Sequence, residues 1–135
     1  MSSSPRILVD TNVLSDVIYD DPKWAAWSSE QLVENAGMLA INPMIYAEIC
    51  YRAPSRVMAD EILRRLELAY LEIPRNALFL ASKAFQKYRD MGGTRTAPLA
   101  DFFIGAHAES EGLSLLTRDT ARYKTYFRKV VLISP

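Results

Sequence analysis

One carboxylate stands in a stretch of sequence that is otherwise apolar. Asp101 lies in the segment PLADFFIGAHA, residues 98–108, where Leu99, Phe102 and their neighbours surround it with hydrocarbon. Consecutive apolar positions indicate a helix that is buried on most of its circumference, because a surface helix confines its apolar residues to one stripe. A carboxylate there is costly unless it is hydrogen-bonded, paired or bound to a metal. Asp101 is therefore the first candidate for a residue that does chemistry.

Three further carboxylates stand where they can meet Asp101: Asp10, Glu48 and Asp119. Asp10 directly follows the apolar run ILV, Asp119 comes two residues after the run LSLLT, and Glu48 lies in a predicted helix that follows a third apolar run. In open parallel sheets the functional crevice lies outside the carboxyl ends of the strands. If the three runs are neighbouring parallel strands, all four carboxylates converge on one crevice.

Four carboxylates in one crevice need a cation between them, because like charges at close range force at least one carboxylate to take up a proton. Magnesium and manganese suit this arrangement, since hard divalent cations take oxygen ligands and leave positions open for phosphate oxygens. The chain has one histidine and one cysteine, which excludes a zinc site built from a cluster of them. The chemistry that such a site serves best is hydrolysis of a phosphodiester, in which the metal lowers the pKa of the attacking water and neutralises charge on the phosphoryl group.

Each of these carboxylates also has a simpler structural interpretation. Asp10 and Asp119 fit helix-cap or turn positions, and Glu48 fits a solvated helix position. Asp101 fits the first turn of a helix, where the helix dipole stabilises an acid. The joint pattern of the four acids is what favours a metal site over these interpretations.

The elements that must position these residues are short strands alternating with longer helices. Short apolar runs predict five strands, at residues 6–9, 38–41, 70–73, 113–117 and 130–134. Capping residues and three-four apolar spacing predict helices between them, at residues 11–20, 21–35, 43–53, 56–69, 75–91 and 98–111. This alternation predicts an open α/β fold with a mostly parallel sheet covered on both faces. With no repeat, linker or low-complexity segment, the length predicts a single domain over residues 1–135.

The charge of the chain is balanced overall but unevenly placed. Lysine plus arginine and aspartate plus glutamate both number 16, which excludes a grossly basic nucleic-acid coat protein. Residues 86–135 nevertheless hold 8 basic and 5 acidic side chains, against 8 and 11 in residues 1–85. The C-terminal part is therefore the part that can hold a polyanion locally.

The sequence predicts a soluble, cytoplasmic protein. A single cysteine, Cys50, excludes an internal disulfide framework and fits a reducing compartment. The apolar run near the N-terminus is too short for a signal-peptide core, and no stretch approaches the length of a transmembrane helix.

Four motifs, taken in order and at their separations, closely resemble the PIN-domain ribonucleases, and specifically the VapC toxins of bacterial type II toxin–antitoxin pairs. The motifs are ILVDTNVLSD, NPMIYAEI, PLADFFIGAHA and LLTRD, and the resemblance spans essentially the full chain. It implies a Rossmann-like three-layer α/β/α PIN domain with a mostly parallel sheet of about five strands. It also implies a ribonuclease that uses Mg²⁺ or Mn²⁺ to cleave single-stranded or looped RNA.

The same resemblance assigns roles to the motif residues. Asp10 and Asp101 match the acids that hold the first metal. Glu48 and Asp119 match the second and fourth acids, which bind a second metal or orient water. The remaining matches support these acids by hydrogen bonds: Thr11, Asn12 and Thr117.

Partners follow from the resemblance as well. Family members are usually dimers, and each is inhibited by a small antitoxin whose tail occupies the acidic groove while its other end binds operator DNA. The expectation here is a homodimer, a VapB-type antitoxin, a heterotetramer or larger complex with it, and operator DNA reached only through the antitoxin. No membrane partner is expected.

Basic residues near Asp119 are candidates for RNA contact. Arg118 and Arg122 flank Asp119 and, with the basic residues that follow, interleave with aromatic side chains, a pattern typical of single-stranded RNA binding. Arg95, in the loop before the Asp101 helix, is a second candidate, and a solvated surface turn is the alternative for both. Gly105 lies one turn after Asp101, where it admits substrate or allows tight helix packing.

The alternative function is a noncatalytic PIN-fold RNA-binding or regulatory module. Two unrelated magnesium-binding classes are disfavoured. A receiver-like signalling domain needs an Asp at the end of the third strand, where this chain has Pro74 and Arg75. A haloacid-dehalogenase-type phosphatase needs a second Asp two positions after Asp10, where this chain has Asn12.

Overall fold

Five short parallel strands form the centre of the fold, in the order β3-β2-β1-β4-β5. The computed structural model describes residues 5–93 and 99–135. The strands are β1 (Ile7–Val9), β2 (Leu39–Ile41), β3 (Ala69–Tyr70), β4 (Ser114–Leu116) and β5 (Leu132–Ile133). In the central strand, Leu8 is aligned with Ala40 of β2 and with Leu115 of β4. The predicted α/β class with about five parallel strands is confirmed.

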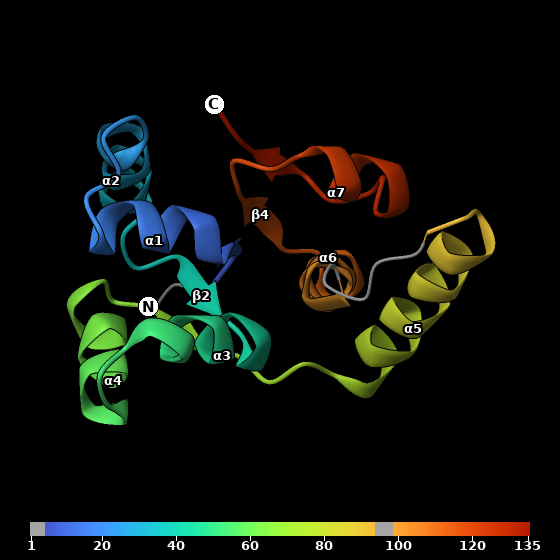
Figure 1. Cartoon of the computed structure of the whole chain (residues 1–135), viewed down its shortest axis with the longest axis horizontal. Coiled ribbons are helices and arrows are strands. Elements are labelled where there is room, and N and C mark those ends of the chain that lie inside the picture. The colour runs from blue at the N-terminus through green and yellow to red at the C-terminus, as the bar shows by residue number, and fades with distance from the viewer. Residues whose placement is uncertain (1–4, 94–98) are drawn as a thin grey trace.

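Seven helices connect these strands within the described residues and complete a Rossmann-like three-layer arrangement (Figure 1). They are α1 (Thr11–Ile18), α2 (Ala25–Glu34), α3 (Pro43–Arg52), α4 (Arg56–Arg65), α5 (Arg75–Asp90), α6 (Leu99–Glu111) and α7 (Ala121–Tyr126). In Figure 1, α5 lies at the outside of the molecule and packs on α6, which in turn contacts β4. Over the described residues, no helix is both long and apolar enough to cross a membrane.

Several predicted boundaries were wrong by a few residues, and local backbone chemistry explains why. The helix predicted to start at Asp21 starts at Ala25, because the Asp21 carboxylate accepts the N–H groups of Lys23 and Trp24 and forms a turn. The helix predicted over 56–69 ends at Arg65, because Glu67 adopts a positive φ of 53°. The short helix α7 was not among the predicted helices.

The central strands and α6 supply the core. Every residue of β1 and β2 is buried, and so are six of the thirteen residues of α6. Phe102, Ile104, Ala106 and Ala108 of that helix are completely inaccessible to solvent. This agrees with the near-absence of a polar stripe in its sequence, so the helix that carries Asp101 is held rigidly by packing.

Gly105 lets α6 pack closely against the segment after α7. A Cβ placed on Gly105 would lie 2.6 Å from Cε2 of the Phe127 ring, and that ring is 1% exposed and has no room to retreat. Gly105→Ala is therefore expected to lower the free energy of unfolding by about 1–3 kcal/mol through overpacking. Urea unfolding checks this value.

The sign of that change is diagnostic. Without the contact, Gly105→Ala would stabilise the helix by up to about 1 kcal/mol, because alanine has the higher helix propensity. Repeating Gly105→Ala in a Phe127→Leu background replaces the ring by a smaller side chain and should recover part of the loss. A stabilised Gly105→Ala protein would show that this glycine is not needed for packing.

Candidate active site

The strand order reverses between β1 and β4, and the site is built at that point. The chain runs from β1 outward to β2 and β3 and then returns across the sheet to β4 and β5. Two neighbouring strands that diverge in this way leave a crevice at their carboxyl ends, where open α/β proteins bind ligands. The backbone N–H of Asp10, directly after β1, donates to the carbonyl of Leu116 at the end of β4 at 2.9 Å. The segments that follow the two strands therefore meet in the crevice.

The Asp10 carboxylate is buried in this crevice and accepts hydrogen bonds on both oxygens. Only 5% of the residue is exposed. Oδ1 accepts the N–H of Thr11 at 2.8 Å, which caps α1, and Oδ2 accepts the hydroxyls of Thr117 at 2.8 Å and Tyr123 at 2.9 Å. Burial raises the pKa of Asp10 to about 6; the hydrogen bond from Thr117 opposes this rise, and the negative charge of Asp101 adds to it.

Asp101 lies in the first turn of α6 and shares a hydroxyl with Asp10. Tyr123 Oη, which donates to Asp10, is also 3.5 Å from Asp101 Oδ1. On the other oxygen, Arg122 Nη1 donates to Asp101 Oδ2 at 2.6 Å. Partial burial raises the pKa of Asp101, the Arg122 guanidinium opposes the rise, and the charge of Asp119 adds to it. The two acids from distant parts of the sequence therefore form one pair around Tyr123.

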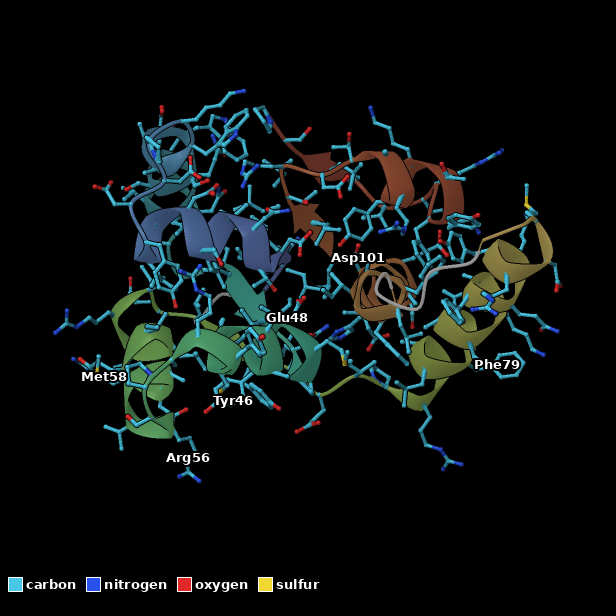
Figure 2. The ribbon with its side chains drawn as sticks, viewed as in Figure 1. Tyr46, Glu48, Arg56, Met58, Phe79 and Asp101 are labelled. Atoms are coloured by element: carbon cyan, nitrogen blue, oxygen red, sulfur yellow. The ribbon has the colours of Figure 1, made fainter. Side chains whose placement is uncertain are left out.

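Glu48 and Asp119 border this pair and are exposed to solvent. Figure 2 shows Glu48 on α3 and Asp101 on α6, both toward the middle of the molecule. The Thr11 hydroxyl donates to Glu48 Oε1 at 2.6 Å, and partial desolvation raises the pKa of Glu48, with the charge of Asp101 contributing. Across the part of the chain that the structure describes, no three Asp, Glu, His or Cys side chains stand close enough together to bind one metal ion. Of the four acids predicted to converge, Asp10 and Asp101 form a close pair, and Glu48 and Asp119 lie at its rim.

A hydrogen-bonded network fixes Asp10 from behind. Thr117 Oγ1 donates to Asp10 Oδ2 and accepts from Asn12 Nδ2 at 3.3 Å and from the backbone N–H of Asp119 at 3.0 Å. Asn12 Oδ1 accepts the backbone N–H of Arg118 at 3.2 Å. These bonds join the start of α1 to the loop after β4, so the orientation of the Asp10 carboxylate is set by both segments.

Comparison with protein families identifies the domain that carries these residues. The PIN domain model matches residues 7–128, which is most of the chain and includes all of the acids described above. The chain belongs to the PIN domain family.

Solved structures resemble this PIN domain over nearly its whole length. The DNA-bound VapBC complex from Salmonella typhimurium matches with a TM-score of 0.70 and 18% sequence identity, over 96% of this chain and 98% of that chain. VapBC2 from Rickettsia felis, bound to a DNA fragment from its promoter, matches with a TM-score of 0.69 and 18% identity over the same shares, 96% and 98%. VapC20 from Mycobacterium tuberculosis, a sarcin-ricin loop cleaving toxin, matches with a TM-score of 0.65 and 13% sequence identity, over 93% of this chain and 98% of that chain. At these identities the likeness shows a common fold. No curated protein sequence matches.

The donor atoms of this PIN domain fit a small divalent cation. Asp10 and Asp101 present carboxylate oxygens on two sides of one hydroxyl, and the side chains that support them also bring oxygen donors. Magnesium is commonly bound by only one or two carboxylates together with water and substrate phosphates, so a cage of three acids is not required. In this structure the Arg122 guanidinium lies on Asp101, which shows that the pair attracts positive charge.

The three arginines predicted to contact RNA have different surroundings. Arg118 forms a two-bond ion pair with Asp16, whose side chain is 3% exposed, at 2.6 and 2.9 Å. Its guanidinium is therefore occupied in holding the loop after β4 to α1. Arg122 is bound to Asp101, as described above, and Arg95 lies outside the described residues. Of the three, Arg122 is the one that the structure places at the acid pair.

Tyr123 is the residue of the PIN site that the sequence did not identify as part of it. The sequence placed it among aromatic side chains that stack on RNA, but it is 1% exposed and its hydroxyl lies between Asp10 and Asp101. Its place at the acid pair depends on α7, which the sequence did not predict as a helix. His107, the one histidine of the chain, is buried and pairs through Nδ1 with Asn42 Nδ2 at 3.1 Å.

Proposed function

We propose that this PIN domain is a metal-dependent endoribonuclease and the toxin of a VapBC-type toxin–antitoxin pair. The observation that carries the proposal is the carboxylate pair Asp10 and Asp101, which meets at the Tyr123 hydroxyl at the carboxyl edge of the sheet. A buried acid with a pKa of about 6 beside a second negative charge is stabilised strongly by a divalent cation. The similarity to VapC20, a sarcin-ricin loop cleaving toxin, supports RNA as the substrate.

Asp10 and Asp101 are the residues that would hold Mg²⁺ or Mn²⁺. The bound metal would lower the pKa of the attacking water and neutralise charge on the phosphoryl group. The Thr117 hydroxyl donates to the Asp10 carboxylate at 2.8 Å and accepts from the Asn12 amide at 3.3 Å. These two bonds keep the Asp10 carboxylate in one orientation. A carboxylate that is already oriented needs no rearrangement when the metal and substrate arrive.

The acids at the rim and Arg122 complete the proposed site. Glu48 has a raised pKa and is held by Thr11, so its carboxylate is suited to accept a proton from the attacking water. Asp119 is exposed beside Asp101 and would either bind a second metal with Glu48 or orient water. Arg122 lies at Asp101, where its guanidinium would bind a phosphate oxygen of the RNA.

The proposed partners follow from the toxin role. We expect a homodimer, inhibited by a small VapB-type antitoxin in a heterotetramer or larger complex, with operator DNA bound through the antitoxin and the toxin acting in the cytoplasm. The similar complexes from Salmonella typhimurium and Rickettsia felis, both solved with DNA bound, support this assembly.

The test is RNA cleavage by the purified full chain with and without metal. We expect cleavage in Mg²⁺ or Mn²⁺, its loss in excess chelator, and its return when metal is restored. Asp101→Asn should reduce the cleavage rate by at least about a hundredfold, because even residues that only support metal ligands cost 10- to 100-fold when changed. Asp90→Asn, at an exposed acid on α5, is the matched control and should cleave like the wild type.

Two results would contradict the proposal. Cleavage that persists in excess chelator, or that is equal in the Asp101→Asn protein, would assign the activity to another site or to a contaminant. RNA binding without metal-dependent cleavage would favour the alternative function, a noncatalytic PIN-fold RNA-binding or regulatory module.

A further inference from the structure

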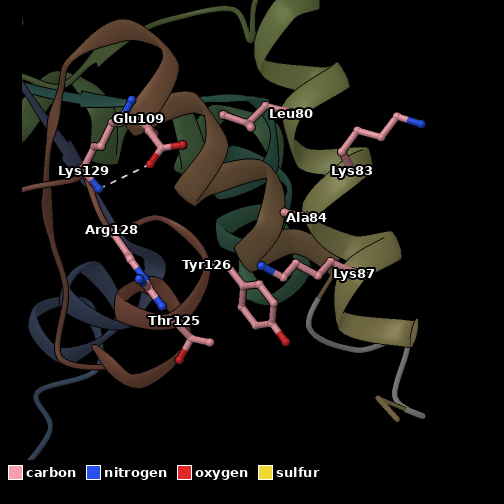
Figure 3. Close-up of a pocket in the computed structure, with 9 residues that line it drawn as sticks. All are labelled: Leu80, Lys83, Ala84, Lys87, Glu109, Thr125, Tyr126, Arg128 and Lys129. Carbon is pink, nitrogen blue, oxygen red and sulfur yellow. Dashed lines mark hydrogen bonds between the residues drawn. The ribbon is translucent and has the colours of Figure 1, made fainter. Parts of the chain in front are cut away.

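A cavity of about 490 Å³ opens between α5, α6 and α7, in the basic C-terminal part of the chain (Figure 3). Its walls carry four cationic side chains and one carboxylate: Lys83, Lys87, Arg128, Lys129 and Glu109. We call this cavity the basic groove. Leu80, Ala84 and the ring of Tyr126 supply its less polar wall.

The cations of the basic groove are not neutralised by the protein. All four are exposed, and none forms an ion pair with another residue in the described ranges. Glu109, the one acid of the groove, accepts the backbone N–H of Lys129 at 3.3 Å. In Figure 3 the Lys87 side chain extends across the opening toward Tyr126. The groove therefore presents a net positive charge to solvent.

Tyr126 lines the basic groove and packs on a residue next to Asp101. Its ring packs on Phe102, the residue after Asp101, with the ring centroids 5.2 Å apart. Arg122 lies one turn before Tyr126 on α7, and its guanidinium is 6.0 Å from the centroid of the same Phe102 ring. Along α6, Glu109 is eight residues beyond Asp101, a rise of about 12 Å. The groove and the acid pair therefore lie along the same helix, α6.

We infer that the basic groove binds the phosphate backbone of the RNA strand next to the cleaved bond, an inference that rests on the proposed ribonuclease function. The candidate active site is acidic, so it repels a polyanion unless cations nearby offset that repulsion. Contacts between lysine or arginine and phosphates supply most of the sequence-independent affinity of proteins for nucleic acids. The half-buried ring of Tyr126 adds an aromatic surface of the kind on which single-stranded bases stack.

An acidic protein segment is the other ligand with suitable charge, and the position of the groove favours RNA. The groove lies along α6, the helix that carries Asp101, with Glu109 about 12 Å beyond that acid, so a strand whose phosphate reaches Asp101 is long enough to extend to it. The experiment below distinguishes the two.

The test measures binding of a labelled single-stranded RNA of about 12 nucleotides to the full chain carrying Asp101→Asn, by fluorescence anisotropy at several salt concentrations. Lys87→Glu with Arg128→Glu is the groove variant. Lys23→Glu with Arg75→Glu is the control, because both residues are exposed, lie outside the groove and give the same change in net charge. The groove variant is expected to bind at least about tenfold more weakly and to lower the slope of log K against log salt by about 1, with the control within about twofold of the parent.

Each outcome either supports or overturns the inference. If the groove variant and the control lose RNA affinity equally, with thermal unfolding unchanged, the loss reflects net charge alone and the inference is overturned. Binding of a polyglutamate peptide through Lys87 and Arg128, with no loss of RNA affinity when they are changed, would also overturn it in favour of a protein ligand.

Failure of the groove is separable from failure of the proposed function. If the wild-type chain cleaves RNA with metal, and the groove variant binds and cleaves like the control, the groove inference fails and the ribonuclease proposal stands. If the wild type cleaves no RNA, the ribonuclease proposal fails. RNA affinity that depends on Lys87 and Arg128 would still support a backbone-binding groove in that case.

Discussion

The Asp10→Asn protein is expected to be more stable than the wild type in metal-free solution above pH 6, and to have lost its RNA cleavage. The Asp10 carboxylate is 5% exposed, and its pKa in the folded chain is about 6, against an ordinary value of 3.8. A shift of this size means that ionised Asp10 destabilises the fold by on the order of 2–3 kcal/mol. Asparagine removes the buried charge, keeps an oxygen for the Thr11 N–H, and presents an amide that can donate to the Thr117 and Tyr123 hydroxyls.

The sign of the pH dependence follows from the direction of the shift. Because the folded pKa of Asp10 is raised, the folded chain binds this proton more tightly than the unfolded chain, and the stability that the bound proton provides is lost as the pH rises from 3.8 to about 6. The advantage of Asp10→Asn should therefore be full above pH 6 and should shrink progressively as the pH falls toward 4. We expect a gain of about 1–2 kcal/mol, because some hydrogen bonds of the carboxylate are weakened in the amide.

Thermal unfolding in excess chelator at pH 8 and pH 4.5 measures this effect. At pH 8 the midpoint of Asp10→Asn should exceed that of the wild type by about 5 °C, and at pH 4.5 the difference should be much smaller. Addition of Mg²⁺ should raise the midpoint of the wild type and leave that of Asp10→Asn unchanged, since a ligand stabilises only the form that binds it. Asp90→Asn, at an exposed acid, is the control and should change neither result.

An Asp10→Asn protein that is less stable than the wild type at pH 8 would contradict this account. It would mean that the hydrogen bonds from Thr117 and Tyr123 to the carboxylate outweigh the cost of its burial. The expected loss of RNA cleavage does not depend on that outcome. The variant should lose at least about a hundredfold in rate whichever way its stability changes, because the amide cannot supply the negative charge that a metal needs.

The parts of the fold that repeat a simple pattern were predictable from the sequence. Buried parallel strands are short apolar runs, so β1, β2 and β4 were found within a residue or two of their bounds. The third strand was predicted over four residues and has two, because the ladder ends at Tyr70 and Leu71 adds only a single bond to Ile41. Strand ends depend on the neighbour's length, which a local pattern does not contain.

The sequence could predict those residues of the site that directly follow strands or lie at the beginning of helices. Asp10 directly follows β1, and Asp101 lies in the first turn of α6, the helix that leads into β4, so both could be assigned to the carboxyl edge of the parallel sheet. The hydroxyl of Tyr123 between them could not, because that contact depends on how α7 turns after Asp119. Asp16 was missed for a similar reason, since its partners Ser28 and Arg118 come from α2 and from the loop after β4.

Asp16→Ala is expected to lower the free energy of unfolding by about 3–5 kcal/mol, the usual cost of removing one partner from a buried ion pair. Asp16 is 2% exposed and accepts the Ser28 hydroxyl at 2.6 Å and two bonds from Arg118. In the wild type, Arg118 Cζ also lies 5.1 Å from the centroid of the Trp24 ring. The alanine leaves the Arg118 guanidinium at this position without its carboxylate partner. Chemical unfolding measures the loss, and a fall of roughly 10 °C or more in the thermal midpoint should accompany it.

Arg118 itself provides the control that separates a structural role from an RNA contact. The double variant Asp16→Leu with Arg118→Met replaces both charges by apolar groups, and it should recover much of the stability that Asp16→Ala loses, because no unpaired charge remains. Arg118→Met alone should destabilise the chain, since it leaves Asp16 buried without a counter-ion. If Arg118→Met instead weakened RNA binding and left the free energy of unfolding unchanged, the arginine would be a substrate contact and the ion pair incidental. The two bonds at 2.6 and 2.9 Å to the buried Asp16 carboxylate favour the structural role, in which Arg118 holds the loop that carries Thr117 and Asp119 at the edge of the site.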